Sequence, residues 1–242
     1  MRLTALLLAL FAIRASADAL VIPVYYVDRP PLIVTTEDGR LGGPLGERVT
    51  EVFAAAHLQV RWINEPGSRI IQVLTMNHGK ECSFGWYKNA EREAKVLYSL
   101  PFFLDPPAAG LVRANYPLPA EPTLAEMLAR PDLRLALRQY VVYGDFIDRL
   151  IGTVDPLRIS RLNVDNSAIA KMIHAGHADL TIMPNVEIGP VIAAAGFSPE
   201  DFSIVKFNDL PYPEYRYIVC AKQVDIGVMQ KINKAIRDLS LP

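Results

Sequence analysis

Residues 82 to 103, CSFGWYKNAEREAKVLYSLPFF, place a thiol beside two aromatic rings and a charged run. The planar guanidinium of Arg92 could hold a carboxylate through two parallel, charge-assisted hydrogen bonds. The alternative is that Arg92 pairs with Glu91 or Glu93 on a solvated turn, and the sequence alone favours this pairing. The segment therefore offers either an anion-binding site or a charged surface turn.

Cys82 and Cys220 are the two cysteines of the chain. In an exported protein they could form a disulfide, and two free buried thiols are the alternative. In the chain-entropy model, closing so long a loop stabilises the fold by roughly 4 to 5 kcal/mol. Without nearby histidines, the two cysteines make a poor zinc site.

His174 and His177 are spaced as a helical metal pair could be. The pattern favours instead the last turn of a helix and the turn after it, where the imidazoles face the negative end of the helix dipole. The sequence shows no nucleophile elbow, no phosphate-binding glycine loop and no close cluster of metal ligands. We therefore expect no enzyme activity, no cofactor and no bound metal.

The first residues, MRLTALLLALFAIRASADA, have the layout of a secretory signal peptide, with a cation, an apolar run and a small-residue cleavage site. The apolar run covers about eleven residues, whereas a membrane span needs roughly twenty. A short membrane anchor or a buried helix is the alternative. We expect cleavage after Ala17 and a soluble, exported mature protein.

The whole chain has 242 residues, 51% hydrophobic content and a formal net charge of −1. This length is enough for one large or two small domains with packed cores. The near-balanced charge and the absence of a long basic run argue against binding to nucleic acid or to an anionic membrane.

Alternating strands and helices should position the charged segment. Residues 20–27 (LVIPVYYV) predict a buried strand, and residues 46–58 place apolar side chains on one helical face. A strand at 59–66, a helix at 67–80 and a strand at 81–87 complete a β-α-β-α-β order. This order indicates a parallel sheet with helices on its faces.

A proline-dense stretch at residues 102–123, FFLDPPAAGLVRANYPLPAEPT, indicates a crossing between domains. A second β/α unit follows, and the chain ends with two strands and an amphipathic helix. Two α/β lobes joined by two extended crossings predict a hinged molecule. Its ligand should lie between the lobes, at the carboxyl ends of the strands.

Four stretches resemble the extracellular solute-binding proteins of family 3, which include the amino-acid receptors of ABC importers. They are GSRIIQVLTMNHGKECSFG, NAEREAKVLYSLPFF, MIHAGHADLTIMP and the pair YRYIVCAKQ with MQKINKAIRDL. The likeness covers most of residues 20–242. It is nearest to a proteobacterial periplasmic subgroup with GWYKNPERE-like and YPxE-like stretches.

The resemblance implies a type II periplasmic-binding fold, an α/β architecture of two lobes, each with a mainly parallel sheet, joined by two crossing strands. The expected domains are a signal peptide (1–17), lobe 1 (18–109 with 216–242) and lobe 2 (110–215). The implied protein is a periplasmic monomer that binds a small anionic or zwitterionic ligand for an ABC permease or a membrane sensor. Relatives commonly add a helix beyond Leu239, which we expect this chain to lack.

In lobe 1 the resemblance assigns to Arg92 the role of clamping a ligand carboxylate. Phe84, Trp86 and Tyr87 lie where the family lines its pocket, and strand alternation predicts that only one of the last two faces the cleft. Core packing is the alternative for these aromatic residues.

Near the first strand the family places a ligand-stacking aromatic residue, for which Tyr26 is a candidate. Arg29 stands where an aromatic is usual, and this departure indicates a second anionic group on the ligand. Arg69 would face the cleft from a helix start, and a surface position is the alternative.

In lobe 2, LRQYVVYGDF matches a loop and helix start that donate backbone N–H groups to a carboxylate. Tyr140 and Tyr143 of this stretch become ligand-binding candidates. Where the amino-acid receptors carry an aspartate for the ligand's ammonium, this chain has Pro184. The ammonium site is therefore either moved to Glu187 or absent, which argues against an ordinary α-amino acid as ligand.

Two other functions fit the same resemblance. Some lyases, such as cyclohexadienyl dehydratases, share the fold, and Glu187 with Arg92 and Arg29 could imitate their acid and carboxylate-binding groups. A sensory domain that reports to a membrane partner is the other alternative. We predict a solute receptor without catalysis.

Overall fold

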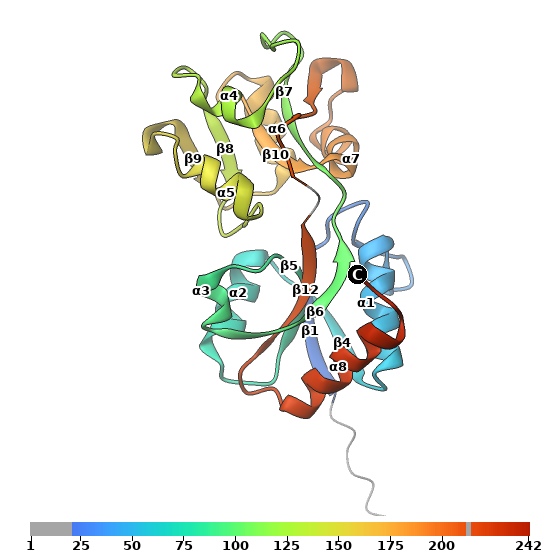
Figure 1. Cartoon of the computed structure of the whole chain (residues 1–242). Coiled ribbons are helices and arrows are strands. Elements are labelled where there is room, and N and C mark those ends of the chain that lie inside the picture. Colours follow the sequence, from blue (N-terminus) through green and yellow to red (C-terminus); the bar gives the residue numbers. More distant parts are fainter. Residues whose placement is uncertain (1–20, 212–213) are drawn as a thin grey trace, which may run out of the picture.

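The structure, a computed structural model, describes residues 21–211 and 214–242 and forms two lobes (Figure 1). The predicted signal peptide at residues 1–17 lies outside the described residues. None of the helices in the described residues combines the length and the apolar character that a membrane span requires.

Lobe 1 is built on a five-stranded sheet in the order β4-β1-β5-β12-β6. Strands β4, β1 and β5 run parallel, as the β-α-β-α-β pattern predicts, whereas β12 is antiparallel to both of its neighbours. The strands are β1 (Val21–Tyr26), β4 (Gln59–Asn64), β5 (Cys82–Trp86), β6 (Val96–Leu104) and β12 (Tyr215–Ala221), with a hairpin of β2 (Val34–Thr35) and β3 (Leu41–Gly42) beside them.

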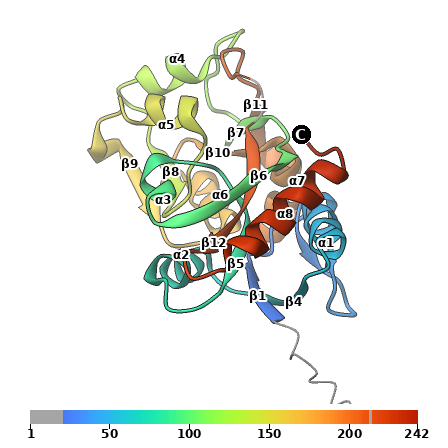
Figure 2. The same ribbon diagram turned by 60° about the horizontal axis from the view of Figure 1, so that its bottom comes forward.

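Helices cover both faces of this sheet because β1 alternates its side chains between them. Ile22, Val24 and Tyr26 point into the larger core, against α1 (Pro44–Ala55) and α8 (Ile226–Asp238). Tyr25 and Val27 lie on the opposite face, against α2 (Gly67–Met76). Figure 2 shows α8 beside α1 on its face of the sheet. A short helix, α3 (Ala90–Glu93), follows β5.

In lobe 2, β10-β7-β11 form an antiparallel sheet, and the parallel pair β8-β9 joins it through a bridge between Leu135 and Leu180. One core lies under α4 and α5, and the other lies under α6 and α7. The elements are β7 (Ala108–Arg113), α4 (Leu124–Ala129), β8 (Leu135–Arg138), α5 (Asp145–Ile151), η1 (Pro156–Arg158), β9 (Ile159–Leu162), α6 (Asn166–His174), β10 (Thr181–Pro184), α7 (Asn185–Ala195), η2 (Pro199–Asp201) and β11 (Phe202–Val205).

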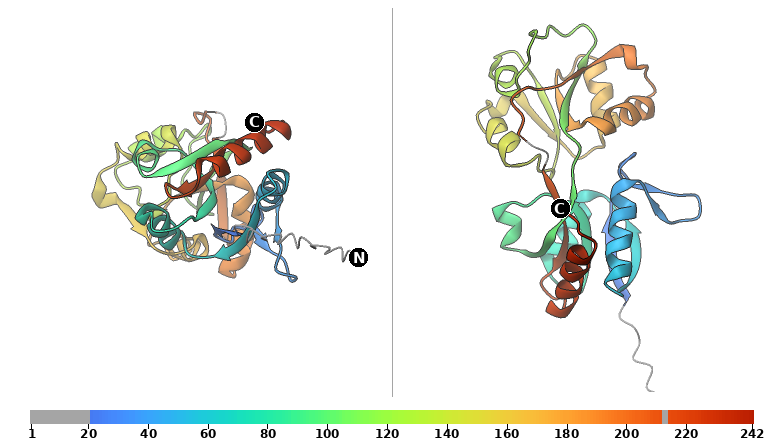
Figure 3. Two further views of the ribbon diagram at one scale, coloured as in Figure 1. Left: turned by 90° about the horizontal axis from the view of Figure 1, so that it is seen from below. Right: turned by 45° about the vertical axis from the view of Figure 1, so that its right-hand side comes forward.

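The chain crosses between the lobes twice, at residues 105–107 from β6 to β7 and again between β11 and β12, where residues 206–211 and 214 are described. Figure 3 shows the described parts of the two segments side by side between the lobes. Where these crossing strands join the two sheets, they pair antiparallel with their neighbours. The predicted lobe boundaries, at 109/110 and 215/216, fall close to these segments and stay predictions.

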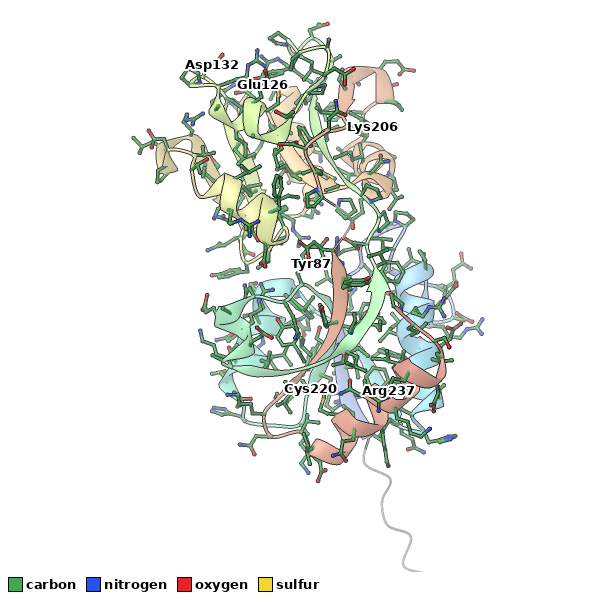
Figure 4. All side chains as sticks on the ribbon, viewed as in Figure 1. Tyr87, Glu126, Asp132, Lys206, Cys220 and Arg237 are labelled. Atoms are coloured by element: carbon green, nitrogen blue, oxygen red, sulfur yellow. A yellow bond between two sulfur atoms is a disulfide. The ribbon has the colours of Figure 1, made fainter. Side chains whose placement is uncertain are left out.

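The two cysteines form a disulfide between adjacent strands, Cys82 on β5 and Cys220 on β12. Both side chains are fully buried in the core of lobe 1, and Cys220 lies far from the other lobe (Figure 4). Of the two alternatives left open by the sequence, the structure has the bonded pair and not the free thiols. A reactive role for Cys82 is therefore excluded in this state.

Candidate functional site

A cavity of about 330 Å³ lies between the lobes, lined by the ends of strands and by loops from both. This volume is in the range of small-molecule sites. From lobe 1 the lining includes the loop after β1, the start of α2 and the end of β5. From lobe 2 it includes the end of β8, the loop before α5 and the first residues of α6 and α7. The cavity therefore lies where the predicted hinge architecture puts a ligand.

The structure brings eight of the ten predicted ligand-binding residues to this cavity. They are Arg29, Phe84, Trp86, Tyr87, Arg92, Tyr140, Tyr143 and Glu187. Trp86 and Tyr87 both line it, so the expectation that only one would do so is wrong. Gly85 has a positive φ of 81° and β5 ends at Trp86, so strict alternation of side chains stops there.

Tyr26 and Arg69 lie outside the lining. Tyr26 shares the face of Ile22 and Val24, so its ring is buried in the lobe 1 core, and its hydroxyl bonds Thr35 Oγ1 at 2.9 Å. Arg69 is exposed on α2 and donates to Gln72 Oε1 at 3.1 Å, the surface position that the sequence left as an alternative.

Arg92 lines the cavity and does not pair with the glutamates on either side of it in the sequence, because these have other partners. Glu91 pairs with Lys95 at 2.7 Å and Glu93 with Lys88 at 3.0 Å, so the predicted alternative of local pairing is not found. Asn89 caps α3 by accepting the backbone N–H of Arg92 at 2.8 Å. This cap fixes the position of the Arg92 backbone, from which its side chain extends.

The guanidinium of Arg92 lies 4.9 Å from the centre of the Trp86 ring, a cation–π geometry. Its Nη2 donates to the backbone carbonyl oxygen of Tyr140 at 2.8 Å, across the cleft. Tyr140 has a positive φ of 64°, and its side chain is half exposed. Burial lowers the pKa of Arg92, and the Tyr98 hydroxyl opposes the shift.

A second bond across the cleft joins Arg29, after β1, to Glu187, in the first turn of α7. The Glu187 side chain is 3% exposed and that of Arg29 is 18% exposed. Glu187 was predicted as a substitute ammonium site, and Arg29 as a site for a second anionic group. In this structure each is the partner of the other.

At the floor of the cavity Arg216 and Tyr87 belong to a buried network at the hinge (Figure 4 labels Tyr87). Arg216 donates to both carboxylate oxygens of Asp105, at 2.8 and 2.5 Å, and to the carbonyl of Gly85 at 2.6 Å. The Tyr87 hydroxyl also donates to Asp105. Burial raises the pKa of Tyr87. Sequence reasoning missed Arg216 and Asp105, although a lone arginine in an apolar strand is a usable signal.

Arg138 also lines the cavity and was missed. It ends β8, and its own backbone N–H donates to the Tyr143 hydroxyl at 3.0 Å. Burial raises the pKa of that hydroxyl to about 12. Within the described residues no carboxylate lies within 4 Å of the Arg138 guanidinium, and its buried Nε has no hydrogen-bond partner. A cation at the carboxyl end of an apolar strand was the available signal.

His174 is the last residue of α6, and its ring stacks on Phe197 with centroids 4.1 Å apart. In the described part of the chain no group of three or more histidine, cysteine, aspartate or glutamate side chains is placed to hold a metal ion. The arrangement offers cations and aromatic faces for binding an anion.

No protein-family model and no curated protein matches the sequence. Solved structures do. The arginine-, lysine-, histidine-binding protein ArtJ from Geobacillus stearothermophilus matches with TM-score 0.70 and 15% identity, covering 91% of this chain and 90% of that one. The arginine-bound form of truncated ArgBP from T. maritima matches with TM-score 0.67 and 18% identity, covering 90% of this chain and 95% of that one.

A histidine kinase sensor domain with similarity to periplasmic binding proteins gives TM-score 0.70 and 16% identity, covering 91% of this chain and 90% of that one. The chain therefore has the predicted α/β fold of the type II periplasmic binding proteins. At these identities the likeness extends to the fold and not to the ligand.

Proposed function

We propose that this protein is a periplasmic solute-binding protein that captures a small carboxylated ligand between its lobes, for an ABC importer. The observation that carries the proposal is an interlobe cavity containing Arg92, which has no carboxylate within 4 Å among the described residues. The fold, shared with arginine-binding proteins, supports the same role.

The chemistry of the cavity agrees with this proposal. A guanidinium donates two parallel hydrogen bonds to a carboxylate, and these bonds strengthen where water is excluded. Trp86 fixes one face of the Arg92 guanidinium, which reduces the ordering cost of binding. Because lobe 1 supplies Arg92 and lobe 2 supplies Tyr140, a ligand held here would contact both lobes.

The proposal is tested by thermal shift and calorimetry over a panel of amino acids, monocarboxylates and dicarboxylates. Arg92→Gln should weaken binding of the best ligand about 10- to 100-fold, because charge-assisted hydrogen bonds contribute about 1.5–3 kcal/mol. Arg69→Gln is the matched control, since Arg69 is an exposed lobe 1 arginine outside the cavity. Unchanged affinity in Arg92→Gln would remove the proposed clamp.

Catalysis is the first alternative to distinguish. A lyase of this fold needs a carboxyl group free to act as acid, and Glu187 is bonded to Arg29. A receptor releases its ligand chemically unchanged, so mass spectrometry after prolonged incubation decides between the two. Turnover that Glu187→Gln abolishes would establish the enzyme.

The similarity to a histidine kinase sensor domain favours ligand sensing as a second candidate function. Deletion of the gene distinguishes the two roles in cells. Loss of uptake of the bound solute supports an importer subunit, whereas retained uptake with a lost response to the solute supports a sensor.

A further inference from the structure

The charges that line the cavity are unequally matched. Four arginines line it, namely Arg29, Arg92, Arg138 and Arg216, together with the carboxylates of Asp165 and Glu187. Glu187 is bonded to Arg29, and Arg216 is bonded to Asp105, which lies behind the lining. Arg92 and Arg138 are the two lining cations with no carboxylate within 4 Å in the described part of the chain.

Asp165 is engaged elsewhere. Its carboxylate caps α6 by accepting the backbone N–H of Ala168 at 2.8 Å, and it also accepts the hydroxyl of Ser167 at 2.8 Å. The Ala168 N–H lowers the pKa of Asp165, and Arg138 contributes a smaller attraction. Asp165 is an exposed residue at the rim, so solvent screens its charge. It does not neutralise Arg138 inside the cavity.

Arg138 needs an acceptor that the described chain does not give it. Its Nε is buried without a partner, an arrangement that native proteins usually avoid. Burial lowers its pKa, and the neighbouring charge of Arg29 lowers it further. The attraction of an anionic group beside Arg138 would offset both effects.

The same inventory disfavours a cationic group on the ligand. An ammonium needs a carboxylate or several uncharged acceptors, and the two carboxylates of the lining already serve Arg29 and the α6 cap. A guanidinium ligand would also find no available carboxylate. It would lie next to Arg92 and Arg138, which have no carboxylate partner among the described residues. The cavity therefore selects against arginine and against zwitterions.

We propose that the ligand is a dicarboxylate without an amine, with one carboxylate on Arg92 of lobe 1 and the other on Arg138 of lobe 2. The inference rests on the proposed function and names its substrate class. The second anion site that the sequence suggested at Arg29 belongs to Arg138, because Arg29 is held by Glu187. A dicarboxylate of this kind bridges the lobes and favours their closure.

Calorimetry with matched acids tests this inference. Succinate, glutarate and adipate are compared with butyrate, pentanoate and hexanoate, and with the amino acids glutamine and arginine. We expect the best dicarboxylate to bind about 10- to 100-fold more tightly than the monocarboxylate of equal length. Arg138→Gln should abolish this advantage. Arg161→Gln, an exposed lobe 2 arginine outside the cavity, should leave every affinity unchanged.

The outcomes separate this inference from the proposed function. If amino acids or monocarboxylates bind as tightly as dicarboxylates, or if Arg138→Gln keeps the dicarboxylate advantage, the inference is overturned while the receptor stands. If glycerol phosphate binds more tightly than every dicarboxylate, the dianion is a phosphate and the inference is wrong. If no acid in the set binds, both proposals fall. Unchanged circular dichroism and melting of the unliganded variants confirm that they are folded.

Discussion

Arg216 and Asp105 form a buried ion pair at the point where the crossing strands leave lobe 1. Their side chains are 6% and 1% exposed, and the Tyr87 ring lies 4.1 Å from the Arg216 guanidinium. The geometry satisfies several donors of the arginine, which is what allows a charge to stay buried. The network fixes Tyr87, which also lines the ligand cavity.

Arg216→Met should destabilise the protein by about 3–5 kcal/mol, because it leaves the Asp105 carboxylate buried without its cation. Urea unfolding measures the loss. Arg40→Met, which breaks an exposed pair with Asp38, should cost less than about 1 kcal/mol. Adding Asp105→Leu to Arg216→Met should recover stability, and a double variant as unstable as the sum of both single variants contradicts this account.

Sequence reasoning predicted cavity-lining residues where a strand end or the family resemblance indicated their position, as it did for Arg92 and Tyr87. It missed Arg138 and Arg216, whose importance depends on which carboxylates lie near them. Pairing across the cleft, such as Arg29 with Glu187, joins residues far apart in the chain. No local pattern encodes such a contact, because it exists only once both lobes have folded and met.

The order of strands and helices was readable because β1 and α1 carry clear apolar periodicity. The antiparallel pairing of β12 with β5 and β6 could not be predicted, since it depends on where the chain returns from the second lobe. Tyr26 was assigned to the cleft on its family position, although alternation from Ile22 and Val24 already places it in the core.

The disulfide joins β5 to β12 across 138 residues of sequence. It therefore links the strand that returns from lobe 2 to the sheet of lobe 1. Replacing both Cys82 and Cys220 with alanine should lower the free energy of unfolding by about 5 kcal/mol in the chain-entropy model. Guanidinium unfolding of the variant and of the oxidised protein measures the difference. Dithiothreitol should destabilise the native protein and leave the alanine variant unaffected. A loss below about 1 kcal/mol would show that β12 is already held without the bond.

At the scale of the whole molecule, two polar contacts span the cleft in the described part of the chain: the Arg29–Glu187 ion pair and the hydrogen bond from Arg92 to the Tyr140 carbonyl. They lie on the cavity lining, and the crossing segments join the two lobes (Figures 1 and 3). The described structure is thus a closed form whose closure is held in part by the protein's own charges. A ligand that binds both lobes adds to this closure, and its affinity depends on how stable the closed form already is.

Glu187→Gln should shift the molecule toward an open form, because it removes the negative charge that neutralises Arg29 in the closed state. Breaking one side of such a pair costs about 3–5 kcal/mol, so the ratio of closed to open molecules should fall at least about 100-fold. Small-angle X-ray scattering should then report a larger radius of gyration without ligand, and saturating dicarboxylate should reverse it. Glu126→Gln, at an exposed position of α4 far from the cleft, is the control. Identical scattering from Glu187→Gln and the unaltered protein would mean that the ion pair follows closure and does not stabilise it.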